Sequence, residues 1–255
     1  MSPSPAKVAL VTGGARRIGR AIVEDLAANG WAVAIHVNRS REEADKLAAA
    51  LHANGGRATV VVADLEDIEG LPAVLAEAAA SLGPVTLLVN CASIFEPDEI
   101  GTLDPAQWNR QLTVNLAAPV FLAQAFAAQL PAGVDGNIVN FVDQRVLKPT
   151  PRHFSYQLSK SALFTATTTL AQALAPRIRV NAIGPGPTLP SERQSAEEFR
   201  RQTDALPLRR GAGLDELGRA IRFLVETPSI TGQMLALDGG QHLMWETPEI
   251  RGVSE

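Results

Sequence analysis

Short apolar runs alternate with helical segments along nearly the whole chain, and this alternation restricts the possible folds more than any other feature. Seven runs are expected as strands, at residues 7–12, 32–36, 58–63, 85–90, 137–142, 179–183 and 234–237. The first is a continuous apolar run, as expected for a parallel strand buried on both faces. The alternation predicts an α/β fold with a doubly wound parallel seven-stranded sheet and helices on both of its faces.

The segments between these runs carry helix signals. Helices are expected over residues 18–29, 40–54, 71–82, from 105 onward, and 154–175. Ser40 is expected to be an N-cap, with Glu43 completing a capping box. Asp104 precedes Pro105, and proline is favoured at the first helical position. Pro119 is expected to kink or end the helix that begins at Pro105.

The 255 residues suit one α/β domain, and no linker, repeat or break in composition divides them. We therefore expect a single dinucleotide-binding catalytic domain over residues 1–255. Residues 184–213 depart from the alternation, because they form a long, proline-rich and charged segment. This segment is interpreted as a mobile substrate lid around residues 186–212.

Charge and composition exclude several classes of function. The net charge of −4 gives no support to nucleic acid or an anionic membrane as a partner. No stretch is expected to approach the roughly 20 apolar residues that span a bilayer. The N-terminal apolar run is too short for a signal peptide, and the single Cys91 cannot form an intramolecular disulfide, so we expect a cytoplasmic protein. His36, His52, His153 and His242 share no metal-ligand spacing, so no metal site is expected.

The turn after the first strand has the sequence TGGARRIG, from Thr12 to Gly19. Glycine lets a backbone approach a pyrophosphate, and the N-terminus of the following helix supplies free amide donors and a positive dipole. Its place between the first strand and the first helix indicates a Rossmann-type dinucleotide site. The alternative is a tight turn that needs glycine for packing only.

The end of the second strand bears on the choice of cofactor. An acidic residue there would bind the ribose 2′-hydroxyl of NAD, whereas an arginine accommodates the 2′-phosphate of NADP. The segment HVNRS, from His36 to Ser40, has no acid, and it contains Arg39. Arg17 lies opposite in the glycine turn, and a planar guanidinium suits phosphate. NADPH is therefore the predicted cofactor, unless both arginines are merely solvated.

Polar residues after the third and fourth strands are further candidates for the cofactor site. Asp64 could accept a hydrogen bond from the adenine amino group or could cap a turn. Asn90 and Ala92 lie where the backbone would meet the cofactor.

The segment YQLSK, from Tyr156 to Lys160, supplies the candidate reacting centre. Residues four apart share one face of a helix. A nearby lysine would lower the tyrosine pKa toward neutrality, and this would make the phenol a useful general acid. Lys160 could also hydrogen-bond the nicotinamide ribose. Tyr156 is the only tyrosine in the chain.

These motifs together resemble the short-chain dehydrogenase/reductase family over nearly the whole chain. The matching pieces are TGGARRIG, NCAS at Asn90–Ser93, Asn115, YQLSK, PGPT at Pro185–Thr188 and LDGG at Leu237–Gly240. The resemblance implies that Tyr156 is the proton donor with Lys160 as its partner. It also implies that Asn115 holds a proton-relay water and that Thr188 touches the nicotinamide amide. The full set of expected cofactor-binding residues is Gly13, Arg17, Ile18, Gly19, His36, Asn38, Arg39, Ser40, Asp64, Leu65, Asn90, Ala92, Ser93, Lys160, Pro185, Gly186 and Thr188.

Two departures from the family pattern narrow the substrate class. Asp143 stands thirteen residues before the tyrosine, where the family usually has a catalytic serine, and Arg17 stands where its turn usually has glycine. Both departures resemble the pteridine reductase branch, which includes dihydromonapterin and dihydrofolate reductases of this fold. That resemblance implies that Phe95 stacks on the pterin ring, that Ser93 and Arg17 make polar contacts to it, and that Asp143 joins Tyr156 at the substrate.

The leading hypothesis is an NADPH-dependent reductase of a pterin or dihydropterin, in which Tyr156 and Asp143 deliver the proton. The residues expected to be catalytic are Asp143, Tyr156, Lys160 and Asn115. Two alternatives stay open: a reductase of ketones, acyl-thioester β-ketones (a 3-oxoacyl reductase) or quinones, and a non-catalytic NADPH-sensing protein. The resemblance further implies a homotetramer formed through the helices after the fourth and fifth strands.

Overall fold

The computed structural model describes residues 7–191, 193–247 and 249, and their core is one parallel sheet in the order β3-β2-β1-β4-β5-β6-β7. The strands are β1 (Val8–Thr12), β2 (Ala32–Val37), β3 (Ala58–Val62), β4 (Leu87–Asn90), β5 (Gly136–Phe141), β6 (Ile178–Pro185) and β7 (Met234–Leu237). All neighbouring pairs are parallel. The predicted fold class is therefore confirmed. The domain range 1–255 and the lid range 186–212 include residues 1–6, 192, 248 and 250–255, which lie outside the described residues.

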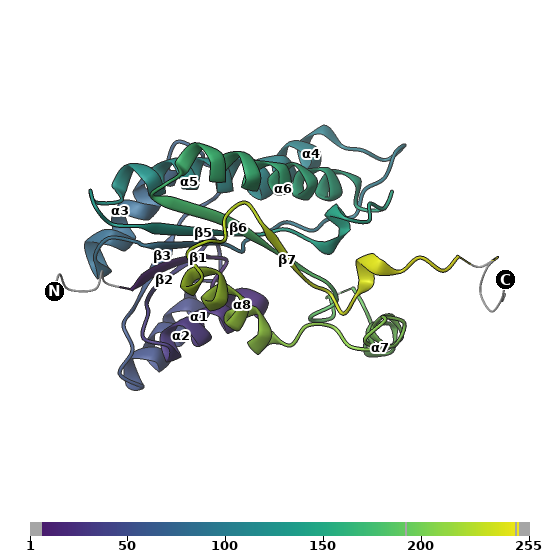
Figure 1. Cartoon of the computed structure of the whole chain (residues 1–255), viewed down its shortest axis with the longest axis horizontal. Coiled ribbons are helices and arrows are strands. Elements are labelled where there is room, and N and C mark those ends of the chain that lie inside the picture. Colours follow the sequence, from purple (N-terminus) through teal and green to yellow (C-terminus); the bar gives the residue numbers. More distant parts are fainter. Residues whose placement is uncertain (1–6, 192, 248, 250–255) are drawn as a thin grey trace.

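Helices cover both faces of the sheet (Figure 1). The helices are α1 (Arg17–Ala28), α2 (Arg41–Ala53), α3 (Leu71–Leu82), α4 (Pro105–Leu112), α5 (Ala118–Gln129), α6 (Phe154–Leu174), α7 (Ala196–Asp204) and α8 (Leu214–Glu226). One core cluster joins α1, α2 and α8 to the sheet, and a second joins α3 and α5 to the opposite face. The helix α8, which packs against α1, was not among the predicted helices.

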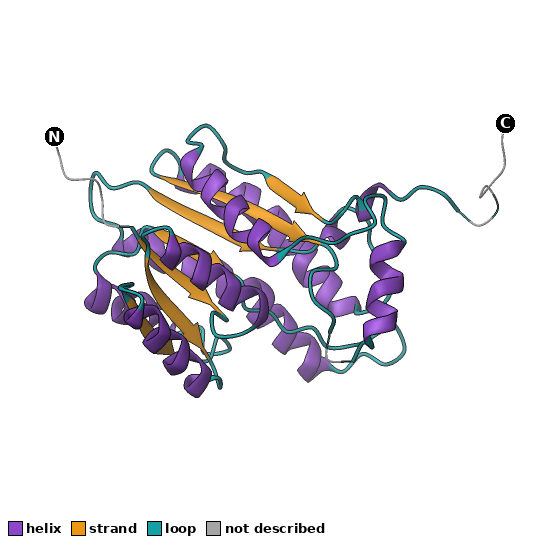
Figure 2. Cartoon of the chain, turned by 90° about the horizontal axis from the view of Figure 1, so that it is seen from below, coloured by secondary structure: helices purple, strands orange, loops and turns teal. Residues whose placement is uncertain are grey.

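The order of the strands fixes where a ligand can bind. The chain runs outward from β1 through β2 to β3, then returns to β4 on the other side of β1. The crossover connections leave on opposite sides at β1 and β4, so a crevice opens at the carboxyl ends of these two strands. Figure 2 shows the loops that leave the carboxyl ends of the strands.

Two local predictions about helices were wrong. Ser40 precedes α2, but its side chain caps no backbone amide, and the Glu43 carboxylate pairs with Arg16 from the glycine turn. The chain does not stop at Pro119 either. It passes from α4 through a π-helical turn, η1 (Thr113–Ala117), into α5, with Pro119 in the first turn of α5. Proline is tolerated there because the wider turn changes the hydrogen-bonding pattern just before it.

The continuous helix from Pro105 to Gln129 also corrects the expectation about apolar stretches. The helix has 25 residues, and its most apolar 18-residue window has a mean hydropathy of 1.3, so it is long and apolar enough to cross a membrane by length and composition alone. Half of its most apolar window is buried within the fold. Leu122 and Phe126 are completely buried in the core. Packing against the sheet therefore accounts for the apolar character of this helix.

The segment interpreted as a lid contains the short helix α7, which begins with a full capping box. The Ser195 side chain accepts a hydrogen bond from the Glu198 amide at 3.2 Å, and the Glu198 carboxylate accepts one from the Ser195 amide at 2.8 Å. No residue of α7 is buried. The helix therefore lies on the outside of the domain, beyond the carboxyl ends of the strands (Figure 1).

Candidate active site

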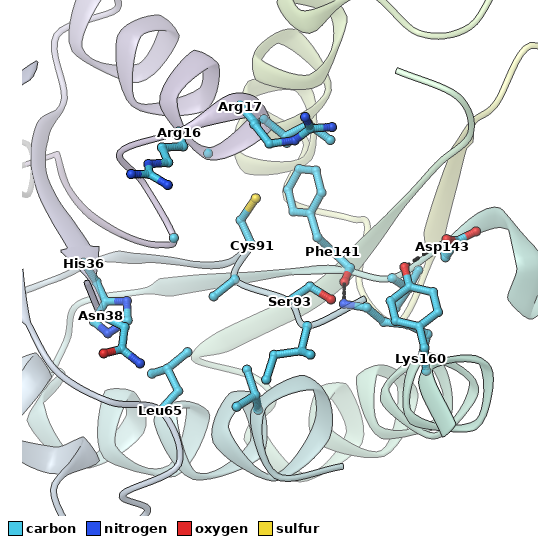
Figure 3. A pocket seen from close by; sticks show the side chains of 18 of the residues that line it. Arg16, Arg17, His36, Asn38, Leu65, Cys91, Ser93, Phe141, Asp143 and Lys160 are labelled. Carbon is cyan, nitrogen blue, oxygen red and sulfur yellow. Dashed lines mark hydrogen bonds between the residues drawn. The ribbon is translucent and has the colours of Figure 1, made fainter. Parts of the chain in front are cut away.

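An open cavity of about 480 Å³ lies at the carboxyl ends of the central strands. Its walls come from the glycine turn after β1, the end of β2, and the loops after β3, β4, β5 and β6, together with α4, η1 and α6. Figure 3 shows most of its lining. The cavity is lined by Gly13, Arg16, Arg17, Ile18, Gly19, His36, Asn38, Asp64, Leu65, Glu66, Cys91, Ala92, Ser93, Ile94, Arg110, Val114, Phe141, Val142, Asp143, Tyr156, Lys160, Pro185 and Gly186.

The glycine turn forms a close-packed cradle that has no room for side chains. Gly13 has a φ of +66°, and a Cβ on it would lie 3.0 Å from the Ala92 Cα. A Cβ on Gly19 would lie 2.1 Å from the Gly13 carbonyl oxygen. The Thr12 hydroxyl accepts hydrogen bonds from the Cys91 and Ala92 amides, both at 3.0 Å, and so joins β1 to the β4 loop. This bare backbone at the start of α1 fits the pyrophosphate of a dinucleotide.

The two arginines of the turn point in different directions. Figure 3 shows Arg16 on the side of His36 and Asn38, and Arg17 on the side of Phe141. Arg17 has a φ of +50°, a conformation that costs a non-glycine residue about 1–2 kcal/mol. Its Nη2 donates a 2.8 Å hydrogen bond to the Pro190 carbonyl oxygen, so it joins the glycine turn to the lid segment.

The adenosine end of the cavity contains Arg16, which the sequence analysis overlooked, besides the expected His36, Asn38, Asp64 and Leu65. Arg39 and Ser40 are not among the lining residues, although they follow directly after Asn38. The sequence prediction chose Arg17 for the phosphate, but the Arg17 side chain is bonded to the Pro190 carbonyl oxygen, and Arg16 is the arginine on the His36 side of the cavity (Figure 3).

His36 and Asp64, two further residues predicted to bind the cofactor, both have polar contacts within the protein. Burial lowers the pKa of His36 to about 4, so the ring is neutral, and its Nε2 lies 3.2 Å from the Ala63 carbonyl oxygen. The Asp64 carboxylate accepts a hydrogen bond from the Glu66 amide at 3.0 Å, which is the turn-capping role that the sequence left open. It also lines the cavity, and a ligand contact remains geometrically available to it.

Asn90 lies inside the sheet rather than at the cavity. Its side-chain amide donates a 2.9 Å hydrogen bond to the Asn140 Oδ1, and only 2% of the residue is exposed. Pro185 and Gly186 line the cavity, whereas Thr188 does not. The Thr188 hydroxyl donates a 3.2 Å hydrogen bond to the Gly186 carbonyl oxygen.

The reacting centre brings together Tyr156, Asp143 and Lys160. The Tyr156 hydroxyl donates a 2.9 Å hydrogen bond to Asp143 Oδ2, and Asp143 Oδ1 accepts one from the Arg145 amide at 2.9 Å. The strand β5 ends at Phe141, so it delivers Asp143 to the beginning of α6, and the carboxylate lies beside the phenol.

The expected effect of Lys160 on the phenol was wrong for this arrangement. Burial raises the pKa of Tyr156 well above its ordinary value, and the negative charge of the nearby Asp143 carboxylate is the second cause. Lys160 lies 5.8 Å from the centre of the tyrosine ring, and its Nζ donates a 2.8 Å hydrogen bond to the Phe141 carbonyl oxygen. Burial lowers the pKa of Lys160 itself to about 8. The phenol therefore carries its proton, as a proton donor must.

The Asn115 side chain is committed to protein contacts. It lies in the π-helical turn and is completely buried. Its Oδ1 accepts hydrogen bonds from the Ile94 amide at 2.8 Å and the Ser93 hydroxyl at 3.1 Å. Its Nδ2 donates to the Ile94 carbonyl at 2.9 Å and to the Ser159 hydroxyl at 3.2 Å. All these contacts hold the β4 loop against α6, so any water would have to bind elsewhere than at this side-chain amide.

Phe95 lies next to the reacting centre, although it is not among the lining of the cavity. Its ring meets the Tyr156 ring edge-on, with the centroids 4.6 Å apart. One of its faces stacks on the His153 ring, with the centroids 4.0 Å apart. The guanidinium groups of Arg145 and Arg193 also lie over the Phe95 ring, 5.4 and 5.9 Å from its centroid. Ser93 lines the cavity, as predicted, and its hydroxyl is bonded to Asn115.

A buried carboxylate fixes the beginning of α6, and no motif revealed it. His153 precedes the helix in a left-handed conformation and caps nothing. Asp98, from the β4 loop, takes this role. Its carboxylate accepts hydrogen bonds from the Ser155 amide at 3.2 and 3.3 Å and from the Ser155 hydroxyl. Its carbonyl oxygen accepts one from the Phe154 amide at 3.2 Å. The loop that carries Phe95 is thus tied to the helix that carries Tyr156.

The Cys91 thiol has no catalytic signature, and a metal centre has no candidate ligands among the described residues. Burial raises the pKa of the Cys91 thiol to about 12, so no reactive thiolate faces the cavity. Among the described residues, no group of three or more histidine, cysteine, aspartate or glutamate side chains could hold a metal ion.

Comparison with known proteins agrees with this geometry. The model of the short chain dehydrogenase family matches residues 7–201. A solved structure of FolM alternative dihydrofolate reductase 1 from Brucella canis, complexed with NADP, is 58% identical, with a TM-score of 0.92 and coverage of 95% of this chain and 96% of that chain. Pteridine reductase 1 of Leishmania tarentolae is 32% identical, over 95% of this chain and 99% of its own. A 3-oxoacyl-[acyl-carrier-protein] reductase of Synechocystis is 30% identical, over 94% of this chain and 98% of its own.

Proposed function

The chain belongs to the short-chain dehydrogenase family, and from this premise we propose that it is an NADPH-dependent reductase of a pterin or dihydropterin. One observation carries the choice of substrate. The Asp143 carboxylate, in the position where the family usually has a serine hydroxyl, accepts a hydrogen bond from the Tyr156 phenol. The similarity to the NADP complex of the Brucella enzyme and to the Leishmania pteridine reductase supports the same reading.

The cavity fits a phosphorylated nicotinamide dinucleotide. The bare backbone of Gly13 and Gly19 would face its pyrophosphate, and Arg16 at the His36 end would meet a 2′-phosphate. Lys160, Pro185 and Gly186 would border the nicotinamide half. When bound, NADPH supplies the hydride.

The protein residues account for the proton. Reduction of a C=N bond of a dihydropterin adds the hydride to the carbon and one proton to the nitrogen, which gives the tetrahydropterin and NADP. Tyr156, whose pKa is raised, holds its proton at neutral pH and can donate it to the ring nitrogen. This leaves Tyr156 as a phenolate, and a proton that Asp143 takes up from the solvent would pass along the hydrogen bond between the two residues and restore the phenol.

The aromatic wall suits a flat substrate. The Phe95 ring meets the Tyr156 ring edge-on, so a heterocycle packed against Phe95 would place a ring nitrogen near the phenol. Ser93 and Arg17, which both line the cavity, would supply polar contacts to the edge of the ring.

The decisive experiment follows NADPH absorbance with 7,8-dihydrobiopterin, 7,8-dihydrofolate and a panel of ketones, a β-ketoacyl thioester and a quinone. We expect turnover of the dihydropterins and little turnover of the carbonyl compounds. Turnover of carbonyl compounds alone would instead make the chain a reductase like its 3-oxoacyl relative. Tight NADPH binding without any turnover would indicate a sensor.

We also propose that the enzyme works as a homotetramer in the cytoplasm. Phe121 on α5 and Leu158 on α6 are 42% and 41% exposed, and these helices follow the fourth and fifth strands. Covering such apolar side chains would stabilise an assembly. Light scattering on a size-exclusion column measures the mass directly, and Phe121→Glu should reduce it.

A further inference from the structure

Proton donation by Tyr156 leaves negative charge at a buried place. The hydroxyl lies 2.9 Å from the Asp143 carboxylate, so the phenolate that remains after donation would face a second negative group. Two negative oxygens at this distance repel each other, and burial removes the water that would screen them. A positive charge nearby would stabilise this state.

Lys160 is the cation that the helix spacing predicts for this task, but it is directed elsewhere. Its Nζ donates a 2.8 Å hydrogen bond to the Phe141 carbonyl oxygen and lies 5.8 Å from the centre of the Tyr156 ring. Burial lowers its pKa to about 8, so its charge also declines as the solution becomes alkaline.

Arg145 is fixed next to both members of the proton-transfer pair. Its amide donates to Asp143 Oδ1 at 2.9 Å. Its carbonyl oxygen accepts a 3.2 Å hydrogen bond from the side chain of Gln157, which directly follows Tyr156 on α6. Its guanidinium carbon lies 5.4 Å from the centroid of the Phe95 ring, and the centroids of the Phe95 and Tyr156 rings are 4.6 Å apart. The positive charge of Arg145 is therefore held against the ring that touches the phenol.

The protein does not neutralise this charge locally. Arg145 forms no ion pair among the described residues, and its Nη1 is buried without a hydrogen-bond partner. Arg193, the other guanidinium over the Phe95 ring, donates a 3.2 Å hydrogen bond to the Glu96 carboxylate. Because a partly buried charge is screened less than a solvated one, Arg145 opposes the rise in the pKa of Tyr156 that burial causes.

Two other titratable groups near the phenol supply no positive charge to it. His153 stacks on the Phe95 ring, and burial, with both guanidiniums nearby, lowers its pKa, so the imidazole is uncharged at neutral pH. The Asp98 carboxylate accepts hydrogen bonds from the amide and the hydroxyl of Ser155 at the beginning of α6.

We propose that Arg145 stabilises Tyr156 in its deprotonated state and so speeds the transfer of the phenol proton to the substrate. In this step the phenol O–H bond breaks, the proton forms an N–H bond with the substrate ring, and the electron pair stays on the phenolate oxygen. The inference rests on the function proposed above, in which Tyr156 is the proton donor. Arg145 acts through the phenol, as a positioning residue, so it should affect proton transfer and not substrate affinity.

The chain contains a single tyrosine, so the ionisation of Tyr156 is directly measurable. Expression with a ring-fluorinated tyrosine labels this residue alone, and the fluorine atoms lower the phenol pKa by induction, toward the pH range in which the protein stays folded. Fluorine NMR of the protein saturated with NADP then gives the ionisation constant without any substrate. In Arg145→Gln, we expect this constant to fall about tenfold. Arg145→Lys keeps the charge and should restore most of it.

Turnover by the unlabelled enzyme tests the same charge. With NADPH and 7,8-dihydrobiopterin, we expect kcat of Arg145→Gln to fall about tenfold and KM to stay within about twofold of the wild-type value. The solvent deuterium isotope effect on kcat should increase, because proton donation becomes the slower step. Structural damage alone would lower kcat without this increase.

Two matched variants serve as controls. Arg152→Gln removes an exposed charge from the same segment between Asp143 and Tyr156. Arg193→Gln removes a guanidinium from the same aromatic ring, but one whose charge Glu96 already balances. In both variants the ionisation constant of the labelled phenol should stay within about twofold of the wild-type value.

An unchanged ionisation constant in Arg145→Gln would overturn the inference, and so would an equal fall in either control. Equal behaviour of Arg145→Lys and Arg145→Gln would also overturn it, since the charge would then not be the property that matters. If the labelled phenol stays protonated in every folded variant, the isotope effect decides, and an unchanged effect overturns the inference. Failure of the wild type to reduce any pterin would instead reject the proposed function, because the NMR titration uses no substrate.

Discussion

The Tyr156 hydroxyl and the Asp143 carboxylate share a 2.9 Å hydrogen bond, in which the phenol is the donor. In this arrangement the Tyr156 phenol, which is the proposed proton donor, lies beside a carboxyl group that can itself carry a proton. A serine in the same place could hydrogen-bond a carbonyl oxygen, but it would not ionise at neutral pH. The pair therefore offers the most direct test of the proposed chemistry.

Asp143→Asn keeps a side-chain oxygen near the phenol but removes the ionisable carboxyl. We expect kcat for dihydropterin reduction to fall about 100-fold, which is within the usual range for loss of a proton-transfer group, while KM changes little. Steady-state kinetics measure this. Tyr156→Phe is the companion variant. If the two residues act as a unit, kcat of the double variant should be no lower than kcat of the more impaired single variant. Undiminished pterin reduction by Asp143→Ser would reject the role of the carboxylate.

Arg16 should contribute to the choice between NADPH and NADH. Arg16→Ala is expected to lower the ratio of kcat/KM for NADPH to that for NADH at least about tenfold, because a phosphate would lose a charge-assisted donor. Arg39→Ala should lower the ratio less, since Arg39 is exposed and does not line the cavity. Glu43→Gln, which frees Arg16 from its ion pair, serves as the control and should not weaken the binding of NADPH. An unchanged ratio in both arginine variants would show that neither holds the phosphate.

Lys160 should make stability depend on alkaline pH. Burial lowers its pKa to about 8, from an ordinary value of 10.5. Between these values the unfolded chain binds a proton that the folded chain has released, so the free energy of unfolding rises with pH. The full rise corresponds to about 3 kcal/mol, and below pH 8 the lysine adds no slope.

Urea denaturation of the wild type and of Lys160→Met, each at pH 7.5 and near pH 10, isolates this contribution. The difference in unfolding free energy between the two proteins should shift in favour of the wild type at the higher pH. A difference that stays constant would mean that the lysine is not desolvated in the folded protein.

Asp98 should position Tyr156 through the beginning of α6. Asp98→Ala removes a buried helix cap, for which we expect a loss of about 1–2 kcal/mol and a Tm lower by about 2–6 °C. It should also lower kcat, because the loop that carries Phe95 is no longer tied to the catalytic helix. Asp98→Asn retains acceptor capacity and should recover much of kcat.

Asp104→Ala provides the matched control for this prediction. Asp104 caps α4 by accepting a 2.9 Å hydrogen bond from the Gln107 amide, but it does not touch α6. This variant should lose a similar amount of stability and keep kcat. Equal losses of kcat in Asp98→Ala and Asp104→Ala would show that Asp98 has a merely structural role.

The sequence by itself determined the sheet, the glycine cradle and the identity of the reacting side chains. Each depends on short-range pattern: apolar runs at regular intervals, glycine directly after β1, and Tyr156 and Lys160 one helical turn apart. Asp143 could also be recognised, but through the resemblance to the family, which usually has a catalytic serine thirteen residues before the tyrosine.

The tertiary structure decided what those side chains do to one another. Spacing suggested that Lys160 lowers the phenol pKa, but Lys160 binds the Phe141 carbonyl oxygen, and burial with Asp143 raises that pKa instead. The cap on α6 comes from Asp98, 57 positions before Ser155, and only the fold brings the two together. Desolvation and side-chain direction depend on neighbours that are distant in sequence, and a local pattern contains no information about them.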